Sequence, residues 1–163
     1  MKKKINVESL VDQIEKITRE KIAKESVVSL EEYRKLKRKS NDMYSVLVIE
    51  DDPTMRAALV RLMEDEGYLV ASAADGTQLE KVFDKNSFDL ILLDVGLPWV
   101  NGFELTEVIK SHEDLKHIPI ILISGMGNEE DFQKGLALGA ESYIKKPFDI
   151  DALKNMVSHL IKK

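Results

Sequence analysis

The sequence contains no cysteine among its 163 residues. Disulfide frameworks, thiolate zinc sites and cysteine nucleophiles are therefore excluded. No stretch approaches the roughly 18 uncharged apolar residues of a membrane span. The basic start, Met1–Lys4, is followed by no apolar core of about 7–15 residues. We therefore expect neither a membrane segment nor a secretory signal, and we expect the protein to be cytoplasmic.

Basic residues are also outnumbered, with 24 Lys and Arg against 29 Asp and Glu, for a net charge of −5. The acidic excess lies in residues 44–163, whereas residues 1–43 are net basic. An acidic body is poorly suited to binding a phosphate backbone. No aromatic residues interleave the basic run Arg34–Lys39. We therefore expect no nucleic-acid binding.

The periodicity of the sequence changes near Met43. A capping box at residues 29–32 predicts a short helix in the first part, and residues 40–42 have the composition of a linker. An earlier helix is predicted by apolar side chains at helical spacing: Val7, Leu10, Val11, Ile14 and Ile17. We therefore predict a helical extension and linker over residues 1–42, followed by one domain over residues 43–163.

The apolar stripe of the first predicted helix needs a cover. It could pair with a second chain, dock on the domain that follows, or bind a separate target. The sequence leaves these three alternatives open. We favour a homodimer or a partner contact through the N-terminal helices.

After Met43, short apolar runs alternate with amphipathic segments. The runs, which predict strands, are Ser45–Ile49, Tyr68–Ala73, Asp89–Leu93, Ile118–Ile123 and Ser142–Lys145. The amphipathic segments predict helices near residues 53–66, 76–85, 102–111, 129–138 and 150–161. This alternation predicts an α/β domain with a doubly wound parallel sheet that is covered on both faces. The third and fourth runs are apolar on both sides, as central strands require.

Polar and charged residues stand where these strands would end. Glu50 and Asp51 follow the first run, and Asp94, Ser124 and Lys146 follow the third, fourth and fifth. Open α/β sheets bind ligands at the carboxyl ends of their strands. Clustered carboxylates need a compensating cation, and Mg²⁺ prefers hard oxygen ligands. A carboxylate in such a site can accept a phosphoryl group, and a lysine and a hydroxyl can then hold the phosphoryl oxygens.

From about Ser45 onward, the chain resembles the receiver domain of two-component response regulators. The motifs that carry the resemblance are Glu50-Asp51, Leu93-Asp94-Val95-Gly96-Leu97-Pro98, Asn101-Gly102, Ser124-Gly125 and Tyr143-Ile144-Lys145-Lys146-Pro147-Phe148. Their order and separations also match the family. Each motif alone is weak, but the set in this order is very specific.

The resemblance implies a phosphoacceptor and a metal site. Asp94 resembles the aspartate that is phosphorylated and also contacts the metal. Asp51 resembles the carboxylate that binds Mg²⁺ directly, and Glu50 beside it acts through water. The backbone carbonyl of Gly96 resembles the third protein ligand.

The resemblance also assigns the groups that respond to the phosphoryl group. Ser124 resembles the hydroxyl that swings toward it, and Lys146 resembles the lysine that pairs with it. The Lys146–Pro147 bond is expected to be cis. Tyr143 resembles the aromatic ring that changes position on activation, and Gly125 matches the small residue that gives the phosphoryl group access.

For the whole domain, the resemblance implies a flavodoxin-like (βα)5 sheet with strand order 2-1-3-4-5. A histidine kinase or a histidine phosphotransfer protein would donate the phosphoryl group in a phosphorelay. The domain would catalyse only its own phosphorylation and dephosphorylation rather than act as an enzyme on other substrates. Output would pass through protein–protein interaction with a downstream target that the sequence does not identify.

Two positions depart from the family's usual pattern. Gly96 stands two residues after Asp94, and Met126 stands two residues after Ser124. In the family, side chains at these places influence loss of the phosphate. Neither residue can hydrogen-bond an attacking water well, so we predict slow self-dephosphorylation.

Other interpretations make different demands on the sequence. A phosphorylation-independent interaction module would not need the complete set of site residues. A haloacid-dehalogenase-like phosphatase would need an aspartate where Gly96 stands. A phosphate-binding loop would need a glycine-rich run ending in Lys-Ser or Lys-Thr, which residues 125–128 do not provide. Trp99, in the loop after Pro98, is interpreted as a partly exposed contact residue.

Overall fold

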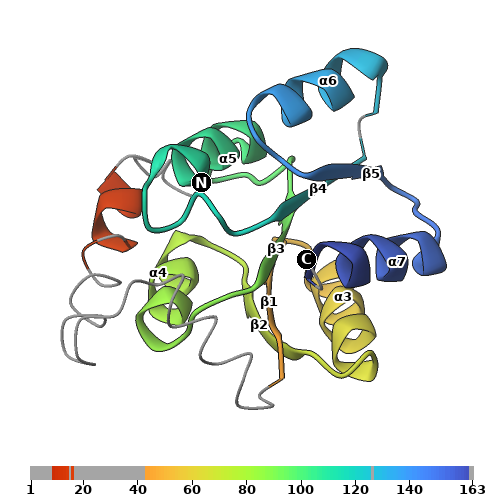
Figure 1. Cartoon of the computed structure of the whole chain (residues 1–163), viewed down its shortest axis with the longest axis horizontal. Coiled ribbons are helices and arrows are strands. Elements are labelled where there is room, and N and C mark those ends of the chain that lie inside the picture. Colours follow the sequence, from red (N-terminus) through yellow and green to blue (C-terminus); the bar gives the residue numbers. More distant parts are fainter. Residues whose placement is uncertain (1–8, 15, 17–42, 126, 162–163) are drawn as a thin grey trace.

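The computed structural model describes residues 9–14, 16, 43–125 and 127–161. Its body is one parallel sheet with helices on both faces (Figure 1). The strands are β1 Ser45–Ile49, β2 Leu69–Ala73, β3 Leu90–Asp94, β4 Ile120–Ser124 and β5 Ser142–Lys145. The helices are α3 Pro53–Asp65, α4 Gly76–Lys85, α5 Gly102–Ser111, α6 Glu129–Ala137 and α7 Ile150–Ile161.

The strand order is β2-β1-β3-β4-β5, and every neighbouring pair is parallel. The predicted doubly wound, flavodoxin-like sheet is therefore confirmed. Three strands begin later than the sequence indicates, at Leu69, Leu90 and Ile120. The Asp89 carboxylate accepts a hydrogen bond from the Ser45 amide at 2.8 Å and so closes the start of β1. Pro119 has no amide proton to give to the sheet, which delays β4.

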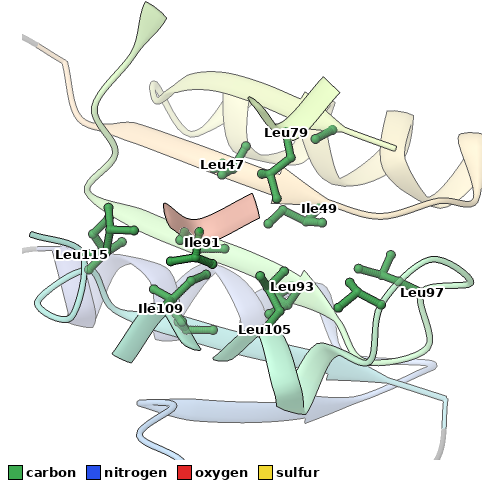
Figure 2. Close-up of a cluster of buried hydrophobic side chains, with 14 of the residues drawn as sticks. Leu47, Ile49, Leu79, Ile91, Leu93, Leu97, Leu105, Ile109 and Leu115 are labelled. Carbon is green, nitrogen blue, oxygen red and sulfur yellow. The ribbon is translucent and has the colours of Figure 1, made fainter. Parts of the chain in front are cut away.

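Alternation along each strand divides the core between the two faces of the sheet. In β1, Leu47 and Ile49 face one core, whereas Val46 and Val48 face the other. The first core packs under α4, α5 and α6, and the second under α3 and α7. Figure 2 shows part of the first core. All five residues of β1, β3 and β4 are buried, as central parallel strands require.

The helix ends follow local sequence signals. The Asp52 carboxylate accepts a hydrogen bond from the Thr54 amide at 3.0 Å, and Pro53 occupies the first turn of α3. The chain then turns at Gly67, whose φ of 91° a β-carbon would disfavour. These contacts confirm the predicted start and end of the first helix of the domain.

The N-terminal segment is helical at residues 9–14 and 16, and it packs on the domain. This packing corresponds to the second of the three alternatives for its apolar stripe. The expected dimer stays a prediction. The short helix predicted after residue 29 lies outside the described residues. Within the described ranges, no helix combines the length and the apolar character needed to cross a lipid bilayer.

Candidate functional site

The predicted site residues gather at one edge of the sheet because all strands run in the same direction. Glu50 and Asp51 follow β1, and Asp94 is the last residue of β3. Ser124 is the last residue of β4, and Lys146 directly follows β5. The chain leaves β1 toward β2 on one side and reaches β3 on the other. The acidic residues therefore lie at the point where strand order reverses, which is where such sheets bind ligands.

Three carboxylates form the centre of this site. Oxygen atoms of Glu50, Asp51 and Asp94 all lie within 4.8 Å of one another. Glu50 is 1% exposed and Asp94 is 6% exposed, so their negative charges are largely removed from water. Such a cluster of hard oxygen ligands fits Mg²⁺, whose charge would offset the repulsion among the carboxylates.

Lys146 supplies the positive charge nearest to this cluster. Its Nζ donates to Glu50 Oε2 at 3.0 Å and lies 3.5 Å from Asp94 Oδ1. The backbone amide of Lys146 donates to the Ser124 carbonyl at 2.7 Å, which fixes β5 beside β4 at this end. The Lys146–Pro147 bond is cis, as expected. Lys146 is therefore held within reach of any group bound to Asp94.

Burial and pairing oppose each other at these two charges. Burial raises the pKa of Glu50 above its ordinary value, and the negative charge of Asp94 adds to the rise. The hydrogen bond from Lys146 acts in the other direction but does not cancel the effect of burial. Burial lowers the pKa of Lys146, but its contacts with Glu50 and Asp94 outweigh this, so the net pKa is raised. Lys146 is therefore protonated and positively charged at neutral pH.

The loop after β1 is held by a residue that sequence reasoning missed. One guanidinium nitrogen of Arg56, in the first turns of α3, donates to the carbonyls of Glu50 at 3.0 Å and Asp51 at 3.1 Å. The Asp52 amide donates to Glu50 Oε1 at 3.2 Å. These bonds fix the backbone of the acidic pair and orient the Glu50 side chain. The only sequence signal for this contact was a basic residue, Arg56, shortly after the acidic pair.

The loop after β3 returns tightly against the strand it leaves. The Gly96 amide donates to Asp94 Oδ1 at 3.2 Å. A β-carbon at Gly102, the first residue of α5, would lie 2.6 Å from Val95 Cα and 2.7 Å from the Asp94 carbonyl oxygen. Only glycine permits this approach. The structure thereby explains why Gly102 stands in the Asn101-Gly102 motif.

Trp99 belongs to the same loop and corrects one prediction. The expectation of a partly exposed contact residue is wrong, because Trp99 is 1% exposed. Its indole N–H donates to the Ala74 carbonyl at 3.0 Å, after the end of β2. A buried tryptophan commonly finds such a partner. Trp99 therefore anchors the β3–α5 loop to the neighbouring β2–α4 loop.

Ser124 and Tyr143 lie on neighbouring strands but in different surroundings. Ser124 is buried at the same edge as the acidic cluster, and Gly125 beside it is exposed with open space around its α-carbon. Tyr143 lies inside β5 and is 8% exposed. Its ring packs edge-to-face on Phe132 of α6, with centroids 6.0 Å apart. The structure thus places Tyr143 under α6 rather than among the carboxylates.

Known families account for most of the described domain. Residues 46–158 match the family described as the response regulator receiver domain. The chain therefore belongs to the receiver-domain family of two-component response regulators, and the predicted class of protein is confirmed. The family works in phosphorelay signalling, in which receivers interact with histidine kinases or phosphotransfer proteins.

Individual relatives agree with this assignment. The TorCAD operon transcriptional regulatory protein TorR of Escherichia coli K12 is 34% identical over 118 residues, or 72% of this chain and 50% of TorR. The chain spans about half the length of the curated relatives that it matches first.

Two solved structures are similar in both fold and sequence. The chemotaxis protein CheY4 of Vibrio cholerae has a TM-score of 0.66 and 32% identity, covering 73% of this chain and 99% of that one. The receiver domain of the sensor histidine kinase PA1611 from Pseudomonas aeruginosa PAO1 has a TM-score of 0.66 and 27% identity. It covers 75% of this chain and 100% of that one, and it was solved with a magnesium ion coordinated in its active site cleft.

Proposed function

We propose that this chain accepts a phosphoryl group on Asp94 from a histidine kinase or a histidine phosphotransfer protein in the cytoplasm. The observation that carries the proposal is the convergence of three carboxylates and one lysine at the strand edge. Asp94 is the member of this cluster that contacts both the Lys146 ammonium, at 3.5 Å, and the Gly96 amide, at 3.2 Å. One of its oxygens is thereby oriented, and the other remains for reaction.

The acidic residues supply a metal site for this reaction. Asp51, Asp94 and the Gly96 carbonyl would hold Mg²⁺ directly, and Glu50 would hold it through a water. Mg²⁺ would lower the charge barrier between the carboxylates and an incoming phosphoryl group. Arg56 keeps the Glu50–Asp51 loop in place through its two carbonyl contacts. The fit rests on the donor set, which is composed of hard oxygen atoms within one short span.

The proposed reaction transfers the phosphoryl group from a nitrogen atom to an oxygen atom. A carboxylate oxygen of Asp94 forms a bond to phosphorus as the bond from phosphorus to the donor imidazole nitrogen breaks. The electron pair of the broken bond stays on that nitrogen, and the imidazole leaves as a neutral ring because its other nitrogen carries a proton. Lys146 pairs with the added negative charge, and the Ser124 hydroxyl binds a phosphoryl oxygen.

Phosphorylation would then shift an equilibrium between two conformations. Ser124 would move toward the phosphoryl group and Tyr143 would change position, which would remodel the surface of β4, β5 and the helices after them. A change in the position of the Tyr143 ring would alter its edge-to-face contact with Phe132. Output would pass through a protein partner that recognises the changed surface.

Intact mass spectrometry tests the proposed acceptor. Incubation with acetyl phosphate and Mg²⁺ should add one phosphoryl group to the wild type and none to Asp94→Asn. Asp52→Asn is the matched control, because Asp52 is an acid beside the site whose carboxylate is occupied in capping α3. This control should be labelled like the wild type. Equal labelling of Asp94→Asn would place the acceptor elsewhere. Labelling of none of the three would favour a phosphorylation-independent module.

We also propose that the phosphoryl group is lost slowly. Gly96 is exposed beside the site and has no side chain that could hold an attacking water. The wild type is expected to stay phosphorylated for minutes or longer after acetyl phosphate is removed. Gly96→Asn, which adds an amide at this position, should shorten that time. A lifetime of seconds in the isolated wild type would contradict the proposal.

A further inference from the structure

The N-terminal segment presents a sharply divided surface. Leu10, Val11 and Ile14 are 2%, 0% and 1% exposed. The polar residues between and beside them on the same helix are exposed: Ser9, Asp12, Gln13 and Lys16. Burial at this level means that other atoms cover the apolar stripe completely, and the stripe packs on residues of the domain itself.

The surface that receives the stripe is part of the domain core on the α4 and α5 side of the sheet. Leu10, Val11 and Ile14 belong to the same buried cluster as Leu47 of β1, Ile91 of β3, Leu79 of α4 and Ile109 of α5. Figure 1 places the segment, coloured red, beside α4 and α5, and Figure 2 shows the same segment next to Ile91. We name this side of the cluster, represented by these four residues of the domain, the α4/α5 seat.

We propose that the α4/α5 seat binds the helical segment at residues 9–14 of its own chain, so that this helix is a permanent part of the receiver and not a dimer contact. The apolar stripe and the seat bury each other, and each would expose apolar surface to water alone. The proposal concerns the occupant of this surface and is independent of the chemistry at Asp94.

Chain length permits this arrangement within one molecule. Residues 17–42 can span up to about 85 Å at ~3.3 Å per residue, whereas a domain of this size has a radius of gyration of only about 14 Å. A segment tethered over such a distance competes at an effective concentration of up to about millimolar. A second copy of the chain at micromolar concentration would therefore lose the competition for the seat.

Two consequences follow from an occupied seat. The folding unit includes residues 9–14, so its boundary lies upstream of the predicted one at residue 43. The α4/α5 side is also closed to helical partners of the receiver unless they displace the segment. Partners are therefore expected to use other faces of the domain.

A matched pair of substitutions in the full chain tests the proposal. Val11→Asp places a charge in the seat, whereas Gln13→Asp adds the same charge on the exposed side of the same helix. Val11→Asp should lower the melting temperature by about 10 °C or more. Gln13→Asp should change it by no more than about 2 °C. Equal melting temperatures for the two variants would overturn the proposal.

Two further measurements guard against an unfolded variant and against exchange between chains. Val11→Ala removes apolar contact without adding charge and should lower the melting temperature by roughly 3–8 °C. Light scattering should give a monomer mass for both the wild type and Gln13→Asp. A wild-type dimer that Val11→Asp or Val11→Ala converts to a monomer would show that a second copy fills the seat, which would also overturn the proposal.

Discussion

Among single residues, Glu50 is subject to two opposing effects, burial of its charge and pairing with Lys146. The carboxylate is almost completely buried, and it lies beside two other carboxylates with one lysine for a partner. Its pKa is raised because burial outweighs that pairing. A cation bound at the cluster would relieve the conflict. We therefore expect a bound cation to stabilise the folded protein.

Glu50→Gln tests this conflict in protein kept free of metal by a chelator. A carboxyl group with a raised pKa stabilises the fold below its ordinary pKa of 4.5, and this contribution is lost as the pH rises through the folded-state pKa. Glutamine imitates the protonated form at every pH. Glu50→Gln should therefore melt about 2–4 °C above the wild type near pH 7.5, with a smaller difference near pH 5.

The control for this measurement is Glu64→Gln, which neutralises an exposed acid on α3. Its melting temperature relative to the wild type should depend little on pH. A Glu50→Gln variant that melts below the wild type near pH 7.5 would show that the ion pair with Lys146 outweighs burial.

At the scale of elements, the site depends on how closely helices and strands approach. α5 begins directly against the end of β3, and Gly102 makes that approach possible. At the opposite edge of the sheet, Lys110 of α5 donates to the carbonyls of Lys116 at 3.1 Å and Ile118 at 2.8 Å, and to Glu141 at 2.6 Å. The first residue of α5 thus contacts the end of β3, and Lys110 in its last turn contacts the chain just before β4.

Gly102→Ala should destabilise the protein by about 1–3 kcal/mol, because the added methyl group meets backbone atoms that cannot rotate away. Gly125→Ala is the control, since nothing lies within 4 Å of its added β-carbon and the backbone there is not left-handed. Chemical denaturation gives both values. A Gly102→Ala variant as stable as Gly125→Ala would mean that α5 can shift away from β3 at no cost.

Lys110→Met should lower the free energy of unfolding by about 2–3 kcal/mol, because two carbonyls and one carboxylate lose a largely buried charged partner. Lys116→Met is the control. Lys116 pairs with Glu113 at 3.1 Å on the surface, where such pairs contribute about 0–1 kcal/mol. The comparison is made by urea denaturation. Similar values for the two lysines would show that water replaces the contacts of Lys110.

At the scale of the whole molecule, the parallel sheet connects the site to both cores. Residues of β1, β3 and β4 face each core alternately, and the same strands end at the carboxylates and the serine of the site. A ligand that bridges these strand ends should therefore stabilise the entire domain and not only the loops that it contacts.

Mg²⁺ should raise the melting temperature of the wild type, by the equivalent of about 2.7 kcal/mol when it is present at 100 times its dissociation constant. Asp51→Asn should abolish the response, because a metal ligand loses its charge. Asp52→Asn changes the neighbouring acid, which caps α3, and should retain the response. The measurement is a thermal melt at increasing Mg²⁺ concentration. An unchanged response in Asp51→Asn would remove Asp51 from the proposed ligand set.

The helices, the strands and the residues at their ends follow from local patterns in the sequence. Periodicity located the five strands within about two residues, and polar residues after apolar runs identified Glu50, Asp94 and Lys146 as neighbours at one edge. These features are local, because hydrophobic alternation and capping act over a few residues. Parallel strands then make the meeting of their carboxyl ends a necessary consequence.

Features that depend on long-range packing could not be predicted from the sequence and became visible only in the folded chain. The sequence gives Trp99 no visible partner, yet its indole reaches the Ala74 carbonyl and the side chain is buried. The cover of the apolar stripe at Leu10, Val11 and Ile14 could have been any of three surfaces, and the structure places it on the α4/α5 seat. Because hydrophobic burial is non-directional, an apolar stripe predicts that it will be buried but does not identify the surface that buries it.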